Sequence, residues 1–467
     1  MKIGQTSFLG FVAQFVSSVI GFIGTIYVTR NLGADVFGTY ALVVAIVLWL
    51  HVIGEAGVLS ALKTYLSRDY DKNRYFSAAG VLLALSFTTL TILVLAAANL
   101  INQYIGAEFA WTIPILLFSV LTMAYVMSGL EGEHLVHIAG LLEPMQISVR
   151  SILHICVVFF GIGITGLLVG HAIGGMIASI IGIYYISARF TSPDTRAISD
   201  IISFARFSWL GTISTRTFAA MDTVVLGFFV STGLIGQYEV AWSLASLLAF
   251  FGIAVSKAVF PEVSSLSGAG KHNRVQNILH DALSFAGFLL IPGLVGSVVI
   301  GRGILSMYGS EFPNAYTILL VLICARLVYA YGEQFSSAAT ALKHPEISFK
   351  INLVFISLNC SLNLILVYLY GWVGAAVATF LSAFSTLILG YTLFSKILDI
   401  SFPITEIGYQ LLAATIMGSA LYGLKSFFET DIWFTLGAVV VGAGLYLAVL
   451  SVLSEKFRVT IARNISL

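Results

Sequence analysis

Residues 30–40 read Arg30-Asn31-Leu32-Gly33-Ala34-Asp35-Val36-Phe37-Gly38-Thr39-Tyr40 and form a short polar hinge between two apolar runs of helical length. A related stretch occurs later in the chain, reading Gly227-Phe228-Phe229-Val230-Ser231-Thr232-Gly233-Leu234-Ile235-Gly236-Gln237-Tyr238. Each contains a glycine, then an apolar-Gly-x-Tyr step, then a new apolar run. Glycine lets the backbone turn where a Cβ would clash, and tyrosine suits a boundary between apolar and wet surroundings. A chain that restarts its own pattern is predicted to contain two copies of one unit.

The composition indicates a membrane protein. Of the 467 residues, 58% are hydrophobic and only 10% are charged, whereas a soluble domain has about 25% charged residues. Residues 351–394 contain no Asp, Glu, Lys, Arg or His. The apolar runs are long and do not alternate, so they predict transmembrane helices rather than the strands of a barrel.

The apolar runs predict an all-α polytopic protein with fourteen spans. Their approximate bounds are 7–29, 37–62, 76–98, 110–130, 143–161, 165–188, 205–230, 235–258, 279–300, 313–340, 347–369, 373–395, 404–424 and 432–453. The first run is interpreted as an uncleaved helix and not as a signal peptide, because no cleavage pattern follows it. The loops are short, so the usual kind of enzyme active site has no soluble domain to occupy.

Further matches extend the repeat beyond the hinge. Lys72-Asn73-Arg74 is echoed by His272-Asn273-Arg274, and Tyr104-Ile105-Gly106-Ala107-Glu108-Phe109 by Tyr308-Gly309-Ser310-Glu311-Phe312. We therefore expect two parallel six-helix lobes, residues 1–190 and 197–396, with helices 13 and 14 in residues 403–467 outside the repeat. Two such lobes favour alternating access around a cleft, whereas a channel would need a selectivity filter that is not evident.

Lysine and arginine set the expected orientation. With the N-terminus inside, only Arg30, Arg302 and Lys425 fall in outer loops, and most of the other basic residues fall in inner loops. Both termini are therefore predicted to be cytoplasmic, in a multi-pass protein of the cytoplasmic (plasma) membrane.

Several kinds of partner and chemistry have no sequence signal. The net charge is +1, and no basic cluster suggests nucleic acid. Cys156, Cys324 and Cys360 lie in apolar runs without pairing or metal-ligand spacing. No phosphate-binding glycine loop or nucleophile motif is found. We expect no cofactor, and a monomer surrounded by membrane lipids.

Four motifs together point to a known family. They are Arg30-x-Leu32-Gly33 with Phe37-Gly38-x-Tyr40; Asp222 with Leu226-Gly227; Gly236-x-Tyr238-x-x-Ala241; and Asn363 followed by Tyr370-Gly371-x-x-Gly374-Ala375-Ala376. The pattern resembles the multidrug/oligosaccharidyl-lipid/polysaccharide exporter superfamily, and within it the Wzx-like oligosaccharide flippases. The resemblance covers residues 5–395. A proline that the family usually has shortly after the asparagine of span 11 is replaced here by Val367 or a neighbour.

This resemblance implies a substrate and a direction of transport. The substrate would be a polyprenyl- or dolichyl-(pyro)phosphate-linked oligosaccharide, moved from the inner to the outer leaflet for cell-surface glycan or glycoprotein assembly. Coupling to an H⁺ or Na⁺ gradient is one option within the superfamily. The glycan, the lipid carrier and the coupling ion stay open.

Basic residues inside the spans are the candidate binding groups for an anionic head group. Arg150, Arg216 and Arg326 fall within predicted spans, and Lys350 is the repeat counterpart of Arg150. A charge at bilayer depth is costly and usually faces a cavity or a partner. The fork of donors on arginine suits phosphate. The alternative for each residue is a structural ion pair or a side chain that reaches the interface.

Span 10 carries a polar face. Arg326, Tyr329 and Glu333 recur at i, i+3 and i+7, which places them on one side of an otherwise apolar helix. A cavity wall would have this pattern, so Tyr329 joins the candidate substrate-binding residues.

Acidic residues are the candidates for ion coupling. Glu55 follows His51 by one helical turn, so the two share a face of span 2 and could form a proton-coupling pair. Asp222 in span 7 is the other candidate. The alternatives are an interfacial polar contact for the pair and a structural bond between the lobes for Asp222.

Two other functions are alternatives to a flippase. An ion-coupled drug/cation antiporter of the same superfamily would need a cavity dominated by carboxylates, whereas the mid-span arginines favour an anion. A membrane-embedded glycosyltransferase or ligase would need a sizeable loop with acidic catalytic residues, and none is present. The sequence therefore predicts a transporter and not an enzyme.

Overall fold

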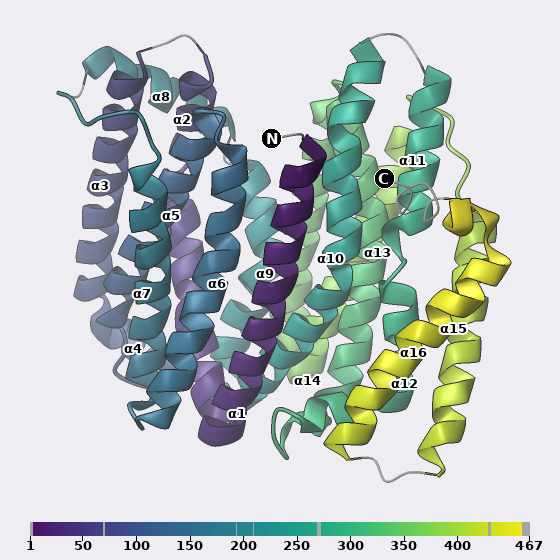
Figure 1. Ribbon diagram of the computed structural model, residues 1–467. Coiled ribbons are helices and arrows are strands. Elements are labelled where there is room, and N and C mark those ends of the chain that lie inside the picture. Colours follow the sequence, from purple (N-terminus) through teal and green to yellow (C-terminus); the bar gives the residue numbers. More distant parts are fainter. Residues whose placement is uncertain are drawn as a thin grey trace. The chain divides into compact units, whose positions relative to one another are not determined.

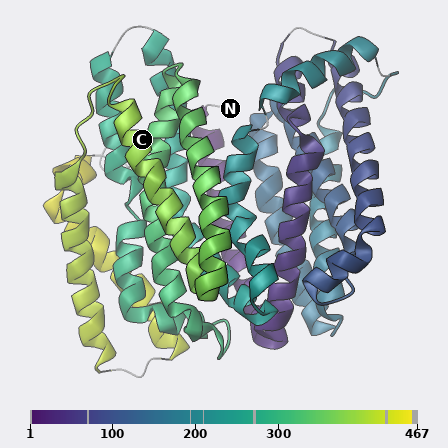
Figure 2. The ribbon, with the colours of Figure 1, turned by 180° about the vertical axis from the view of Figure 1, so that it is seen from behind.

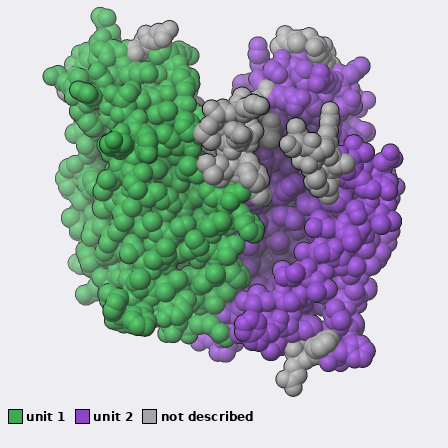
Figure 3. All heavy atoms as spheres, viewed as in Figure 1, with its two compact units in different colours: residues 1–236 green, residues 237–467 purple. Residues whose placement is uncertain are grey.

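The computed structural model consists of helices in the part of the chain that it describes (Figure 1). That part comprises residues 3–68, 71–192, 194–208, 210–268, 272–427 and 431–459. Within these ranges the side chains of residues 3–9, 11, 206–208, 210–216, 257, 258, 261, 267, 268 and 272 are not described. The chain divides into two compact units, residues 1–236 and 237–467, which Figure 3 distinguishes by colour.

Unit 1 holds the first nine helices and the start of the tenth. Their bounds are α1 (Ile3–Glu55), α2 (Val58–Leu66), α3 (Lys72–Ala96), α4 (Ala98–Ile105), α5 (Thr112–Gly132), α6 (Val136–Phe159), α7 (Gly163–Tyr184), α8 (Thr195–Ser208), α9 (Leu210–Phe229) and α10 (Thr232–Gly268). Its apolar core is built mainly from α1, α2, α3, α5 and α7.

Unit 2 contains the rest of α10 and the helices that follow it. They are α11 (His272–Ala286), α12 (Leu290–Ser306), a short 3₁₀ turn (Phe312–Ala315), α13 (Tyr316–Ala341), α14 (Pro345–Phe394), α15 (Ile404–Lys425) and α16 (Ile432–Leu453). The rear view in Figure 2 shows α14 in green; this helix packs along α13. One core cluster joins α11, α13 and the end of α14, and another joins α12, α15 and α16.

Eleven helices of the described chain are long and apolar enough to cross a membrane. Two of them are double: α1 continues through Gly33 and α14 through Gly371, both with non-helical backbone angles. The apolar segment Thr217–Phe229 in α9 is shorter. With two crossings each for α1 and α14 and one for α9, the structure agrees with about fourteen spans, and the predicted all-α polytopic class is confirmed. The lobe boundaries near residues 190 and 197 remain a prediction.

The hinge at residues 30–40 contains a true break in the backbone. Gly33 has φ of 81°, a left-handed value that glycine adopts without the Cβ penalty of other residues. The structure also shows why Gly38 and Gly236 lack side chains. A Cβ on Gly38 would overlap the carbonyl oxygen of Thr232, and one on Gly236 would overlap that of Ala34. The two related stretches therefore lie backbone to backbone within unit 1.

A side-chain bond fixes this crossing. The hydroxyl of Thr232 donates to Asp35 Oδ1 at 3.0 Å. Gly233 lies directly on the Asp35 carboxylate, since a Cβ there would be 2.9 Å from Oδ1. The repeat seen in the sequence thus corresponds to a physical contact between its two copies.

The predicted inner loops of unit 1 are tied together by polar groups. Glu131 forms an ion pair with Lys63 at 2.8 Å. The Glu133 carboxylate accepts hydrogen bonds from the Ser187 amide, the Ser187 hydroxyl and the Ala188 amide, each at 2.8 Å. These glutamates therefore hold α2 and the segment after α7 against the end of α5, which is a structural role.

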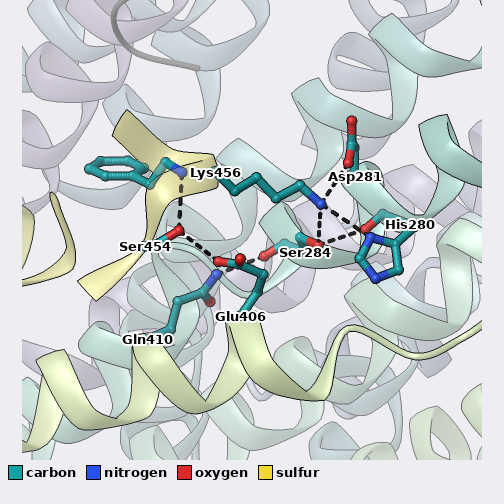
Figure 4. Close-up of polar contacts among 8 residues, drawn as sticks. His280, Asp281, Ser284, Glu406, Gln410, Ser454 and Lys456 are labelled. Atoms are coloured by element: carbon teal, nitrogen blue, oxygen red, sulfur yellow. Dashed lines mark hydrogen bonds and ion pairs between the residues drawn. The ribbon is translucent and has the colours of Figure 1, made fainter. Parts of the chain in front are cut away.

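A second polar network attaches the last residues of unit 2 to α11 and α15 (Figure 4). Lys456 Nζ lies 2.6 Å from Asp281 Oδ1 and donates to the Ser284 hydroxyl at 2.9 Å. The Ser454 hydroxyl donates to Glu406 Oε2 at 2.7 Å. Phe457, next to Lys456, is buried in the core cluster of α12, α15 and α16. Residues 454–457, which follow α16, are thus docked on α11 and α15.

Candidate functional site

Arg326 lies on the polar face of α13 in unit 2. Its guanidinium stacks over the ring of Trp242, with Cζ 4.0 Å from the ring centroid, and its Nη2 donates to the Ser246 hydroxyl. Trp242 and Ser246 both belong to α10. A cation–π contact and a hydrogen bond to a hydroxyl orient the guanidinium. The geometry therefore presents a fixed guanidinium on a membrane-spanning helix.

Tyr329 and Glu333 follow Arg326 on α13. The Tyr329 hydroxyl and the Glu333 carboxylate are hydrogen-bonded across one helical turn. The Tyr329 ring also contacts Phe355 of α14, with centroids 5.8 Å apart. The predicted polar face of α13 is therefore held by contacts between Tyr329 and Glu333, and by the contact of Tyr329 with Phe355 of α14.

Arg150 is the corresponding basic residue of unit 1. It lies in α6 and is half-buried. Its backbone packs tightly on α7, because a Cβ on Gly174 would be 3.1 Å from the Arg150 Cβ. Within the described residues, Arg150 has no ion pair and no side-chain hydrogen bond. The structural alternative for Arg150, a paired carboxylate, is therefore not found among these residues.

Three aromatic side chains that the sequence analysis did not assign to a site lie close to Arg150. The Tyr40 hydroxyl is 2.8 Å from His171 Nδ1, and His154 Nε2 is 2.9 Å from the Leu167 carbonyl oxygen. The rings of Tyr40 and His154 meet edge to face at 5.4 Å. All three side chains are buried. Arg150 is close enough to act electrostatically on each of them.

A sequence signal for this cluster existed but was weak. His154 follows Arg150 by one turn of α6, so the two share a face. Nothing in the sequence links them to Tyr40 or His171, which come from α1 and α7. We call Tyr40, Arg150, His154 and His171 the histidine cluster.

Lys350, the counterpart of Arg150 in the repeat, has a different environment. It is exposed, in the second turn of α14, and it interacts electrostatically with Glu346. Glu346 in turn pairs with His344 at 2.9 Å. Lys350 thus lies near the exposed start of α14, and its binding role stays a prediction.

Arg216 and Asp222 lie on α9. The side chain of Arg216 is outside the described residues, so its predicted role in binding remains a prediction. Asp222 is 5% exposed. Asp222 interacts with other groups of the protein. Its role in ion coupling and the alternative, a structural bond between the lobes, both stay predictions.

His51 and Glu55 form the predicted pair at the end of the second half of α1. His51 Nε2 lies 3.7 Å from Glu55 Oε2, and both side chains are largely buried. The helix breaks directly after them, where Ala56 and Gly57 both have positive φ. The predicted proximity is therefore present, and it lies at an interruption between α1 and α2.

Metal binding has no support in the described chain. Within the ranges given above, no group of three or more His, Cys, Asp or Glu side chains is arranged to hold a metal ion. His134 and His137, which have helical spacing, are both exposed.

Comparison with known proteins identifies the family. The pattern of the polysaccharide biosynthesis protein family matches residues 3–267, more than half of the chain. A protein of Haloferax volcanii named "Probable flippase AglR" is 33% identical over 476 residues, covering 100% of this chain and 99% of the relative. The chain belongs to the polysaccharide biosynthesis protein family.

Other members and neighbours of this family extend the comparison. The Haloferax volcanii protein named "Probable low-salt glycan biosynthesis flippase Agl15" is 24% identical, covering 100% of this chain and 99% of its own. The solved structure described as "Lipid II flippase MurJ, inward closed conformation" has a TM-score of 0.81 at 20% identity, covering 95% of this chain and 98% of that chain. This second likeness is one of fold. The predicted family resemblance is confirmed, as is the expectation of a membrane transporter and not an enzyme.

Proposed function

We propose that this family member is a flippase that moves a lipid-linked oligosaccharide from the inner to the outer leaflet by alternating access. End-to-end similarity to two proteins named as flippases supports this function. The observation in the structure that carries it is Arg150: a half-buried arginine on a membrane-spanning helix, without a carboxylate partner in the described chain. Such a residue suits the phosphate of a lipid-linked sugar.

Each unit supplies one arginine with a defined support. Arg326 is oriented by Trp242 and Ser246, and Arg150 is held where α6 and α7 approach at Gly174. A guanidinium has five N–H donors in a planar fork, a geometry that suits phosphate oxygens. A fixed positive charge in low-dielectric surroundings holds an anion more strongly than the same charge in water. Each of the two arginines, within its own unit, would therefore suit a phosphate of the head group.

The finer features of the substrate and the membrane belong to the same proposal. The carrier would be a polyprenyl or dolichyl phosphate or pyrophosphate, in the cytoplasmic membrane, with both termini of the chain cytoplasmic. The product would be used to assemble a cell-surface glycan or glycoprotein.

Transport is also proposed to draw on an H⁺ or Na⁺ gradient through Glu55, His51 and Asp222. The 3.7 Å separation of His51 and Glu55, beside a helix break, supports this part. If flipping by Glu55→Gln and by Asp222→Asn kept the gradient dependence of the wild type, this coupling would be rejected.

Replacing Arg150 tests the head-group role. In a flippase-deficient strain complemented with this protein, Arg150→Ala is expected to weaken substrate binding by about 1.5–3 kcal/mol, the range for a hydrogen bond to a charged group. This corresponds to roughly a 10- to 150-fold loss of affinity. Arg150→Lys should restore part of the activity because it keeps the charge but loses the fork. The readout is surface glycan per amount of membrane protein.

The matched control is Arg189→Ala, which removes an exposed arginine of unit 1. It should complement fully. Full complementation by Arg150→Ala at normal abundance would remove Arg150 from the binding site. Loss of the protein itself would show that Arg150 is structural.

A further inference from the structure

The histidine cluster joins three membrane-spanning helices of unit 1 through ring nitrogens. Tyr40 comes from α1, Arg150 and His154 from α6, and His171 from α7. Glycines make the approach of α6 and α7 possible: a Cβ on Gly170 would be 3.4 Å from His154 Cδ2. Two buried imidazoles beside one guanidinium are unusual in a membrane span, where ionisable groups mark functional sites.

The hydrogen bonds define where a proton can be added. His154 Nε2 faces the carbonyl oxygen of Leu167, which can only accept, so this nitrogen carries a hydrogen and Nδ1 holds the lone pair. His171 Nδ1 faces a hydroxyl, which can donate or accept. If His171 gains a proton at Nδ1, Tyr40 changes from donor to acceptor and the bond is kept. Both rings can therefore accept a proton without losing their present partner.

Arg150 opposes that proton. In the described chain, the groups that act electrostatically on Tyr40, His154 and His171 are Arg150 and His154. Neighbouring α5 contributes the Ser119 hydroxyl to the Ala172 carbonyl and carries no charged residue before Glu131 in its last turn. A protonated imidazole would therefore add a second positive charge next to Arg150 with no carboxylate to offset either one.

We infer that the histidine cluster is a proton-binding site whose occupancy is linked to an anion on Arg150. A phosphate diester bound to the guanidinium offsets its charge and so removes the repulsion that a proton on His154 or His171 would meet from Arg150. One of the two rings then takes a proton from water, and the proton leaves when the anion leaves. This inference rests on the proposed function, since its anion is the head group of the flippase substrate.

The linkage makes the proton a second ligand and fixes how anion binding depends on pH. Anion binding should be tighter at low pH and should take up protons from the buffer. The uptake should increase as the pH falls toward and below about 6.5, where histidine ordinarily titrates.

Titration calorimetry with purified protein in detergent tests the linkage directly. The probe is a farnesyl-diphosphate-linked N-acetylglucosamine, whose phosphates keep constant charge near neutral pH. Titrations in buffers of different ionisation enthalpy give the number of protons taken up per probe. For the wild type we expect roughly half a proton or more near pH 6.5, and an affinity at least about threefold tighter at pH 6 than at pH 7.5.

Variants locate the proton. His154→Gln and His171→Gln should lower the uptake while still binding the probe at pH 7.5. Tyr40→Phe, which keeps the ring and removes the hydroxyl, should lower it in part. His137→Gln is the matched control, because it removes an exposed histidine from the same helix and should leave the uptake unchanged.

The possible outcomes distinguish failure of the proton linkage from failure of the proposed function. Wild-type binding without proton uptake, or uptake that persists undiminished in His154→Gln, His171→Gln and Tyr40→Phe, would overturn the inference and leave the flippase function intact. Absence of probe binding by the wild type would instead contradict the head-group site, and the linkage with it. If a glutamine variant fails to fold, as judged by size-exclusion chromatography, the wild-type and Tyr40→Phe titrations still decide.

Discussion

Replacement of Gly38 by alanine is expected to remove most of the folded protein from the membrane. A Cβ at this position would overlap the Thr232 carbonyl oxygen and lie 2.8 Å from the amide nitrogen of Gly236. Both neighbours are backbone atoms, so no side-chain rotation can relieve the clash. We expect a loss of about 3 kcal/mol or more in stability, at the upper end for overpacking. Fluorescence-detected size-exclusion chromatography of a tagged protein, with and without heating, measures it.

Gly140→Ala is the matched control for this substitution. Gly140 lies on a membrane-spanning helix, α6, and a Cβ there would meet no heavy atom within 4 Å. Its abundance and thermal stability should equal those of the wild type. Equal behaviour of Gly38→Ala and Gly140→Ala would mean that the two hinge stretches are not in the contact described.

Arg326→Ala is expected to abolish most transport while leaving folded protein. The substitution removes the guanidinium that Trp242 and Ser246 orient, and with it a charge-assisted bond worth about 1.5–3 kcal/mol. Arg326→Lys should recover part of the activity. Complementation of a flippase-deficient strain, normalised to membrane abundance, provides the measurement.

Arg302→Ala controls for loss of an arginine that contacts an aromatic ring. Arg302 stacks over Tyr316 at 5.2 Å but is exposed, at the predicted outer end of α12. It should retain activity. If Arg326→Ala were as active as Arg302→Ala at equal abundance, Arg326 would have no role in the substrate site.

The sequence was sufficient to predict the helices and the breaks between consecutive spans. Apolar runs of spanning length, interrupted by Gly33 and by the Tyr370-Gly371 step, correspond to breaks that the structure shows inside α1 and α14. Local composition decides these features, because a span needs about 20 apolar residues and a left-handed turn favours glycine. The same reasoning could pair His51 with Glu55, since helical spacing alone brings them together.

The histidine cluster could not be predicted from local composition or helical spacing. Tyr40 and His171 are 131 residues apart, and only the packing of α1 on α7 brings them into contact. Periodicity shows which side of a helix a residue occupies but not which helix it meets.

The repeat treats Arg150 and Lys350 as equivalents, whereas the structure gives them different surroundings. Arg150 is half-buried well inside α6, and Lys350 is exposed in the second turn of α14. A lysine one turn from a helix start readily reaches the aqueous boundary. Equivalent positions in two copies therefore need not share a function.

Transfer of a lipid-linked oligosaccharide across a bilayer by the purified protein is the most direct test. The protein is reconstituted into liposomes with a fluorescent short-chain prenyl-diphosphate oligosaccharide, and dithionite quenching reports which leaflet the probe occupies. The account predicts that the wild type moves the probe well above the rate of protein-free vesicles, and that Arg150→Ala and Arg326→Ala do not. Wild-type vesicles that match the protein-free rate, with the protein shown to be folded, would contradict the proposed flippase function.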